Sequence, residues 1–398
     1  MKYKLHEVFE FIRNGANIKQ GIEGGYPITR IETISDRYIN RNKMEYAGIY
    51  DLSKYEDYLL KDGDILMSHI NSEIHLGKSA IYQKKDPEEK IIHGMNLLCL
   101  RPNPKIIFPK YVFYYFNTHF FKMKLNKIIK KSVNQASFSV TDLKKIEIDI
   151  PNIDIQIKIA NTLDKAQELI DKRNAQIEAL DQLTQSVFLE MFGDPVTNPN
   201  GWEIVNLQDI ADYFIGLTYK PNDVSDEGIV VLRSSNIQNG VIDLNDIVRV
   251  KKEVNDKLLV KQNDILMCSR NGSARLVGKV ALIPELEERM TFGAFMTIIR
   301  SRYYCYLYNY FQSSAFRRQI TSGATTTINQ ITKKMLNYVK LPLPPTSLQN
   351  EFAHKVEQIQ HQKEILQTSL LELENMYNSL MQKAFKGELF TEDKVSNF

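Results

Sequence analysis

The chain has 398 residues, of which 43% are hydrophobic and 25% charged, a composition typical of a globular protein with two or three domains. Its net charge of +3 permits binding to nucleic acid without indicating it. The three cysteines are far apart, which argues against a disulfide framework or a zinc ribbon and favours a cytoplasmic setting. The N-terminus lacks a signal-peptide pattern, and no apolar run approaches the roughly 18 residues of a membrane span, so we expect no membrane contact.

The sequence is repeated with a period near 200 residues. Asp-Ile-Leu-Met at 64–67 recurs at 264–267, and Gly77-Lys78 is matched by Gly278-Lys279. Such a period is too long for a solenoid of small repeats. It predicts two copies of one module in a pseudo-twofold arrangement.

The first part of each copy is rich in short β-type runs separated by turn signals. We place these parts at residues 1–151 and 196–341. Each contains one aromatic helical stretch, Tyr111–Ile129 and Tyr303–Ile320, whose aromatic side chains we expect in the core. The fold class that follows is α+β, with two similar mixed α/β domains.

The second part of each copy, 152–195 and 342–398, carries an apolar seam with 4,3 spacing. Seventeen of twenty seam positions are apolar or aromatic, where composition alone would give about nine, a pattern typical of a coiled coil. The alternative is a pair of amphipathic helices in a bundle. The seam residues on which we rely are Leu163, Ile170, Ile177, Leu180, Val187, Val356, Ile359, Leu366, Leu370, Leu373 and Leu380. Polar residues at Arg173, Thr184 and Lys363 interrupt the seam and can fix its register.

A helix stop and a turn separate the two copies, at Gly193-Asp194-Pro195 and Asn198–Gly201. The second domain therefore begins at the far end of the first helix, and the second helix starts where that domain ends. We expect an antiparallel pair of helices, each about 60 Å long for about 40 residues. The two domains would lie at opposite ends of this pair.

This order of segments resembles the specificity subunit of type I restriction–modification systems. The resemblance covers the whole chain and rests on Ile150-Pro151 with Gln156 and Leu341-Pro342 with Gln349 at the helix starts, and on the linker Met191–Pro195 followed by Asn200-Gly201-Trp202. It also includes the terminal Ala384–Leu389. The first helix start departs from the family pattern, because it lacks the double proline of the second.

The resemblance implies that each domain is a target recognition domain for half of a bipartite, asymmetric sequence in double-stranded DNA. The helices would set the spacing and dock two methyltransferase subunits, which in turn would bind restriction and translocase subunits. S-adenosylmethionine, ATP and Mg²⁺ would belong to those partners. This chain would be non-catalytic, with no cofactor or metal of its own.

The sequence does not favour catalysis by this chain. The Asn/Asp-Pro-Pro-aromatic loop of an adenine methyltransferase is missing, and Gly77-Lys78-Ser79 imitates a P-loop although Ser72 occupies the position of its first glycine. The histidines show no metal-ligand spacing. The remaining alternative is a coiled-coil adaptor that joins two identical proteins without touching DNA. Strong salt dependence of DNA binding would favour DNA recognition over this alternative.

Three pairs of loops carry side chains suited to phosphates and base edges. Solvated loops with ordinary turn chemistry are the alternative interpretation. The first pair follows the Asp-Ile-Leu-Met strand, the second precedes the last strand of each domain, and the third is a weaker pair near Arg30 and Arg233. The candidate residues are Arg30, His69, Asn71, Lys130, Lys131, Asn134 and Gln135 in the first domain, and Arg233, Ser235, Asn236, Arg270, Asn271, Ser273, Arg275, Thr326, Thr327, Asn329 and Gln330 in the second.

Overall fold

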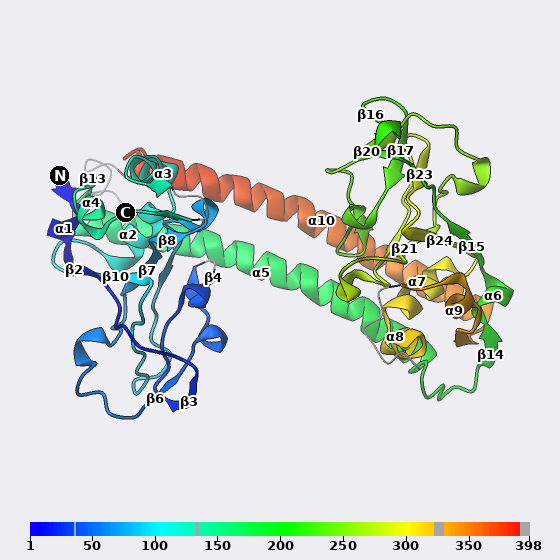
Figure 1. Cartoon of the computed structure of the whole chain (residues 1–398), viewed down its shortest axis with the longest axis horizontal. Coiled ribbons are helices and arrows are strands. Elements are labelled where there is room, and N and C mark those ends of the chain that lie inside the picture. The colour runs from blue at the N-terminus through cyan, green and yellow to red at the C-terminus, as the bar shows by residue number, and fades with distance from the viewer. Residues whose placement is uncertain (36, 132–134, 322–329, 391–398) are drawn as a thin grey trace. The chain divides into compact units, whose positions relative to one another are not determined.

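The computed structural model describes residues 1–35, 37–131, 135–321 and 330–390. It divides into two compact units, Met1–Asn174 with Ser369–Phe398 and Ala175–Thr368. Each unit holds one α/β domain and parts of both long helices, α5 (Ile153–Phe192) and α10 (Thr346–Phe385) (Figure 1). The predicted fold class, two similar α/β domains with two long helices, is confirmed.

The first unit is built on a six-stranded sheet in the order β2-β10-β7-β9-β5-β4. Buried strand β7 has the sequence Ile-Leu-Met-Ser and pairs with β10 and β9. The first strand, β1, pairs with the last, β13, so the two ends of the domain are joined next to α5. The strands are β1 (Lys2–Lys4), β2 (Phe9–Asn14), β3 (Ile22–Gly25), β4 (Ile34–Ser35), β5 (Tyr38–Ile39), β6 (Ala47–Ile49), β7 (Ile65–Ser68), β8 (Ile70–Asn71), β9 (Ser79–Ile81), β10 (Leu97–Pro102), β11 (Lys130–Lys131), β12 (Ala136–Ser137) and β13 (Glu147–Asp149). The helices are α1 (Leu5–Val8), α2 (Pro109–Phe116), α3 (His119–Asn126) and α4 (Val140–Lys144).

The second unit repeats this plan with the sheet order β15-β24-β21-β22 and the pair β14-β25. A second sheet, β16-β20-β17-β23, and the hairpin β18-β19 complete it. The strands are β14 (Glu203–Asn206), β15 (Asp212–Ile215), β16 (Val224–Ser225), β17 (Ile229–Leu232), β18 (Ile237–Gln238), β19 (Val241–Ile242), β20 (Val248–Val250), β21 (Ile265–Cys268), β22 (Val280–Leu282), β23 (Met290–Phe292), β24 (Met296–Arg300) and β25 (Lys340–Leu343). The helices are α6 (Leu207–Ile210), α7 (Tyr304–Gln312), α8 (Ser314–Thr321) and α9 (Lys333–Asn337).

The aspartate of the repeated Asp-Ile-Leu-Met sequence pairs with one arginine in the same way in both domains. Asp64 accepts from Arg101 Nε at 2.9 Å and from Nη2 at 2.7 Å. In the second domain Asp264 accepts from Arg300 Nε at 2.7 Å and from Nη2 at 2.6 Å. Both carboxylates are almost fully buried, and bidentate pairing satisfies a charge that would otherwise be costly to bury. The sequence repeat is therefore a repeat of structure.

Each predicted aromatic helical stretch forms two short helices instead of one. In the first domain the hydroxyl of Thr118 accepts from the backbone N–H of Phe121 and caps α3 as α2 ends. In the second, Ser313 separates α7 from α8. The aromatic side chains fill the cores as predicted; Phe116, Tyr306 and others are buried.

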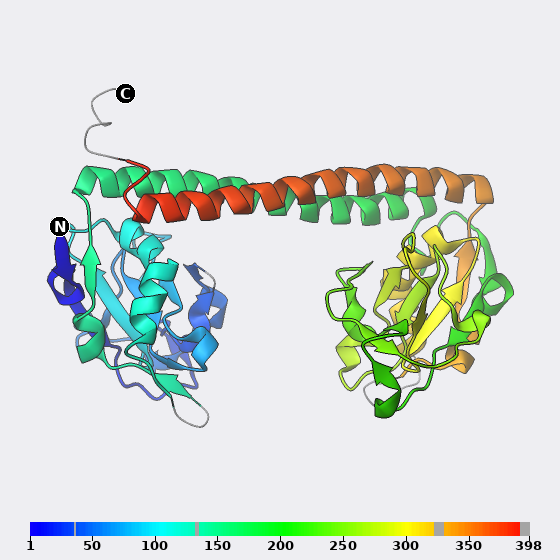
Figure 2. The same ribbon diagram turned by 90° about the horizontal axis from the view of Figure 1, so that it is seen from above.

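The long helices run antiparallel within each unit. In the first unit Leu163, near the start of α5, shares a core with Met381 and Ala384, near the end of α10. In the second, the ring centroid of Phe188, near the end of α5, lies 5.7 Å from that of Phe352, near the start of α10. Figure 2 shows that each domain lies on one side of its helix segments. Every seam residue named above is buried or half-buried, as a helix pair requires.

A buried glutamine fixes the start of each long helix. Gln156 accepts from the backbone N–H of Phe108 at 2.8 Å and donates to the carbonyl oxygens of Ile106 and Pro151 at 3.0 and 2.9 Å. Its counterpart Gln349 donates to the carbonyl oxygen of Pro344 at 2.7 Å. The Pro…Gln pattern thus joins the first helix to its domain and, in the second copy, ties the helix start to the turn before it.

A buried neutral histidine should make the first domain sensitive to acid. Burial, with a further contribution from the charge of Arg13, lowers the pKa of His93 from 6.5 to about 3. The unfolded chain takes up this proton below about pH 6.5, so the contribution of His93 to stability is present above that pH and is lost as the pH falls towards 3. We expect His93→Gln to show a smaller drop in urea midpoint between pH 7.5 and pH 5 than the wild type. Exposed His119 offers the control: His119→Gln should keep the full drop, and an equal drop in all three proteins would contradict the assignment.

Candidate nucleic-acid interface

β-pairing brings together the first two loops of each predicted set. In the first domain β8 pairs with β12, which pairs with β11, so the segments after residue 68 and before residue 138 form one small sheet. In the second domain Arg270 and Gln330 form the matching antiparallel bridge. The N–H of Ile331 donates to the carbonyl oxygen of Ser269 at 2.7 Å. Both domains therefore present a paired-loop surface of the same construction.

In the first domain this surface is basic and partly occupied by internal contacts. Lys130 and Lys131 are exposed on β11, and the amine of Lys131 lies 2.7 Å from the carboxylate of Glu73. The side-chain amide of half-buried Asn71 donates to the Ser68 hydroxyl at 3.3 Å. Gln135 is exposed. The lysines have the reach that phosphate contacts need.

In the second domain the exposed residues are Arg270, Ser273, Arg275 and Gln330. The side-chain amide of Asn271 donates to the Ser234 hydroxyl at 3.2 Å. This bond joins the first loop to the third, so three segments that are distant in sequence meet here.

The third pair of loops has the same local structure in both domains. The N–H of Arg30 donates to Thr33 Oγ1 at 3.1 Å, and that of Arg233 to Asn236 Oδ1 at 2.9 Å. The side chain of Arg30 forms an ion pair with Glu45, and that of Arg233 lies 2.8 Å from the carboxylate of Asp246. Both arginines are half-buried, and Ser235 is exposed.

Two predicted contact residues are enclosed by the protein, and their assignment is corrected. Asn236 is fully buried, and its amide nitrogen donates to the carbonyl oxygens of Asp243 and Asp246 at 2.9 and 2.8 Å. His69 is buried with its ring 6.2 Å from that of Phe138, and burial lowers its pKa. These side chains shape the loops from inside. The predicted contacts Asn134, Thr326, Thr327 and Asn329 lie outside the described residues.

The sequence prediction missed Phe295, which lies beside Arg270. The ring of Phe295 is 59% exposed, and the Arg270 guanidinium carbon lies 5.4 Å from its centroid. The carbonyl oxygen of Phe295 accepts from the backbone N–H groups of Ser269 and Arg270 at 2.9 and 3.0 Å. The sequence repeat carried a signal for this residue. Phe295 aligns with Asn96 of the first domain, which lies in a turn with a φ of 75°.

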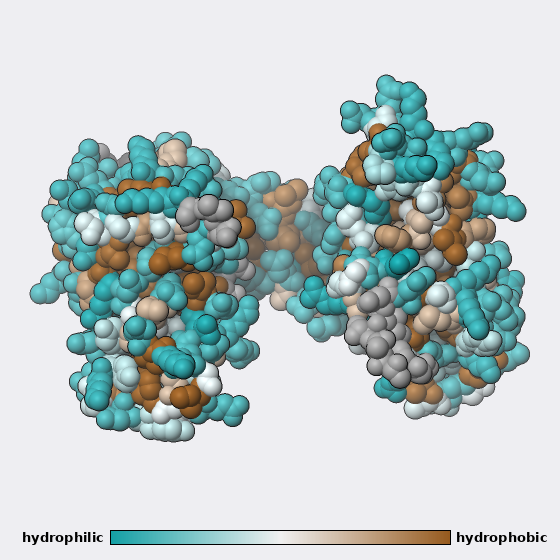
Figure 3. Space-filling view, in the orientation of Figure 1, coloured by the Kyte–Doolittle hydropathy of each residue, from teal (hydrophilic) through white to brown (hydrophobic). Residues whose placement is uncertain are grey.

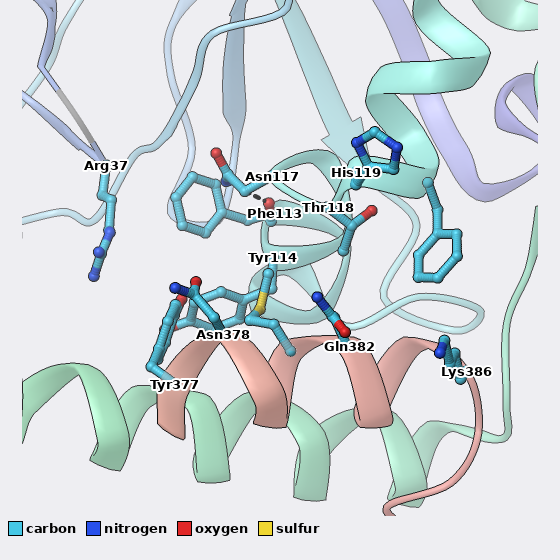
Figure 4. A pocket seen from close by; sticks show the side chains of 12 residues that line it. Arg37, Phe113, Tyr114, Asn117, Thr118, His119, Tyr377, Asn378, Gln382 and Lys386 are labelled. Atoms are coloured by element: carbon cyan, nitrogen blue, oxygen red, sulfur yellow. Dashed lines mark hydrogen bonds between the residues drawn. The ribbon is translucent and has the colours of Figure 1, made fainter. Parts of the chain in front are cut away.

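A hollow of about 640 Å³ lies in the first unit between the α2–α3 junction and the end of α10 (Figure 4). Arg37, His119 and Lys386 give its rim a basic character, and Tyr377 lies under Arg37 with 5.6 Å between the guanidinium carbon and the ring centroid. It is built partly from the long helix, away from the paired-loop surface.

Figure 3 shows that hydrophilic residues cover most of the visible face of each domain.

Within the described ranges, no group of three or more His, Cys, Asp or Glu side chains is arranged to hold a metal ion. None of the helices in these ranges is both long and apolar enough to cross a membrane.

The comparisons with known proteins agree with this architecture. The model of the type I restriction modification DNA specificity domain matches the chain twice, at residues 1–179 and 199–375. A protein of Methanocaldococcus jannaschii described as a putative type I restriction enzyme MjaX specificity subunit is 32% identical over 97% of this chain and 92% of its own length. The EcoKI specificity subunit of Escherichia coli K12 is 30% identical over 40% of this chain and 36% of its own.

Two solved structures share the fold. A chain from the type I R-M system aligns with a TM-score of 0.58 and 17% identity over 98% of both chains. The S subunit of the type I restriction–modification system from M. genitalium aligns with a TM-score of 0.54 and 15% identity over 97% of this chain and 96% of its own. The doubled family match over most of the sequence and the Methanocaldococcus jannaschii relative show that the chain belongs to the family of type I restriction–modification specificity subunits, which recognise DNA.

Proposed function

We propose that this chain reads a bipartite, asymmetric DNA target, one half with each paired-loop surface, and performs no chemistry itself. The observation that carries this proposal is that the two domains share one backbone arrangement at the paired loops but differ in the side chains at equivalent positions. Ile70 and Ser137 in the first domain correspond to Arg270 and Gln330 in the second, because each pair is joined by the same β-bridge. Two such surfaces are suited to two half-sites of different sequence.

The long helices would dock two methyltransferase subunits, which would bind S-adenosylmethionine and recruit restriction and translocase subunits with their ATP and Mg²⁺ in the cytoplasm. Support comes from large apolar side chains that stay exposed on the helices. Leu169, Leu371 and Met376 are 51%, 59% and 51% exposed in the first unit, and Leu189 and Ile365 are 51% and 48% exposed in the second. Large apolar side chains that remain exposed on the helices are available to a protein partner.

Arg270→Ala tests recognition by the second domain. If Arg270 contacts a base edge, we expect this variant to weaken binding by about 1–3 kcal/mol and to relax one position of the second half-site. Binding of the assembled methyltransferase complex to target and single-mismatch DNA, with methylome sequencing of cells, measures both effects.

The matched control is Arg289→Ala, because Arg289 is exposed but paired with Asp256 outside the paired loops. It should leave affinity and specificity unchanged. Equal weakening of Arg270→Ala on every DNA would mark Arg270 as a phosphate contact, and no change would remove it from the interface. Absence of salt-dependent DNA binding by the wild-type complex would favour the adaptor alternative.

A further inference from the structure

Phe295 and Arg270 form a fixed, exposed pair on the second paired-loop surface. Two backbone hydrogen bonds from Ser269 and Arg270 to the Phe295 carbonyl oxygen hold the turn against the loop. The guanidinium lies over the ring, where the quadrupole of the ring attracts its positive charge. The backbone that carries both side chains is therefore held in place before any ligand arrives, which lowers the entropic cost of recognition.

Arg270 differs from three other arginines of the second domain. Arg233, Arg249 and Arg300 each form an ion pair with a carboxylate. Across the described part of the chain, the guanidinium of Arg270 has no carboxylate partner, and it lies over the Phe295 ring. Its N–H donors remain available to acceptors outside the protein.

A hollow of about 380 Å³ opens beside this pair, lined by Tyr213, Thr218, Thr297 and Lys333 as well as by Arg270 and Phe295. The Tyr213 hydroxyl is buried and has no hydrogen-bond partner among the described residues. An unpaired buried hydroxyl is unfavourable, so a polar group that entered the hollow and reached this hydroxyl would gain a hydrogen bond. The hollow has room for the edge of a base beside the Phe295 ring.

In the first domain the matching positions hold Ile70 and Asn96, so the aromatic–arginine pair is present in the second domain alone. A contact made with this pair would therefore distinguish the two half-sites.

The chemistry of the pair matches two neighbouring groups on the major-groove edge of DNA. An exposed phenyl ring suits the C5-methyl group of thymine, and a free guanidinium suits the O6 and N7 acceptors of guanine. We propose that Phe295 and Arg270 together read a thymine next to a guanine in the second half-site. This inference rests on the proposed function and narrows it to a base step.

The experiment uses the assembled methyltransferase complex and oligonucleotides carrying its mapped target. Each thymine of the second half-site is replaced in turn by deoxyuridine, which removes only the methyl group. Burial of one methyl-sized group is worth about 0.8 kcal/mol, so we expect one such replacement to weaken wild-type binding about fourfold. Phe295→Ala should bind thymine and uracil DNA equally at that position. Arg270→Ala should likewise lose its response to 7-deazaguanine at the neighbouring guanine.

Two controls separate this contact from general weakening. Uracil in the first half-site should affect wild type and Phe295→Ala equally. Phe214→Ala probes an aromatic ring that stacks with the internal arginine Arg300 in the same domain, and it should keep the wild-type response to uracil in whatever folded fraction remains.

Four results would overturn the proposal while leaving sequence-specific DNA binding intact. The first is a second half-site without a thymine–guanine step, and the second is wild-type binding that no replacement of thymine by deoxyuridine weakens. The third is a Phe295→Ala variant that responds to deoxyuridine as strongly as the wild type. The fourth is fluorescence of 2-aminopurine showing that a base is drawn out of the stack into the hollow. Absence of sequence-specific binding by the wild-type complex would instead overturn the proposed function itself.

Discussion

Leu370→Asp is expected to destabilise the helix pair and prevent assembly with methyltransferase subunits. Leu370 is a half-buried seam residue near the middle of α10, and a carboxylate there must either lose water or force the helices apart. We expect a loss of about 2–3 kcal/mol in the free energy of unfolding, because the side chain is not fully enclosed. Thermal unfolding and co-purification with the methyltransferase subunits measure the two effects.

The neighbouring residue provides a matched control. Leu371 has the same side chain but is 59% exposed, so Leu371→Asp should leave the unfolding temperature within a degree or two. Leu371→Asp would still weaken co-purification if the exposed face of the helix touches the partner, which separates docking from folding. If Leu370→Asp were as stable as the wild type, the assignment of Leu370 to the seam would be wrong.

The helices and the repeat were predictable because both depend on periodic or local sequence features. The 4,3 spacing reports which side of a helix is buried, and the predicted seam residues are buried or half-buried in the structure. The repeated Asp64 and Asp264 were visible in the sequence, but their role was not. Each aspartate pairs with an arginine 36 or 37 residues later in the chain, and no local sequence pattern predicts a partner at that distance.

The candidate site was predictable at the level of loops and less so at the level of side chains. Loop positions follow from strand and turn signals, whereas the direction of a side chain depends on tertiary packing. His69 and Asn236 have polar side chains in predicted loops, yet packing encloses them. Phe295 was not among the predicted contacts, because large aromatic side chains usually lie in a core; the turn between β23 and β24 leaves it exposed.

A fragment of residues 1–195 should form a homodimer that recognises a symmetric target. This fragment keeps the first domain and α5 but loses α10, so the buried face of α5 around Leu163 and Ile170 would be open to water. The two helix seams share one register at a constant offset of 193 residues. A second copy of α5 can therefore take the place of α10.

The residues at the lost contacts support this substitution. In the first unit Phe385 of α10 lies 5.2 Å from Tyr111 between ring centroids, and in the second Phe192 of α5 lies 5.1 Å from Tyr306. Phe192 is the counterpart of Phe385 at the offset of 193, so Phe192 of the second copy supplies the same ring. An antiparallel pair of identical helices has a true twofold axis, and its interface is isologous.

The dimer would carry two copies of the first domain, so with methyltransferase subunits it should modify an inverted repeat of the first half-site in place of the asymmetric target. Light scattering gives the size of the fragment, and methylome sequencing gives its target. Leu180→Asp in the fragment should abolish the dimer because Leu180 lies in the seam, whereas Leu183→Asp, at a position 44% exposed, should not. A stable monomer, or a dimer that still marks the asymmetric sequence, would mean that the two halves of the chain are not interchangeable modules.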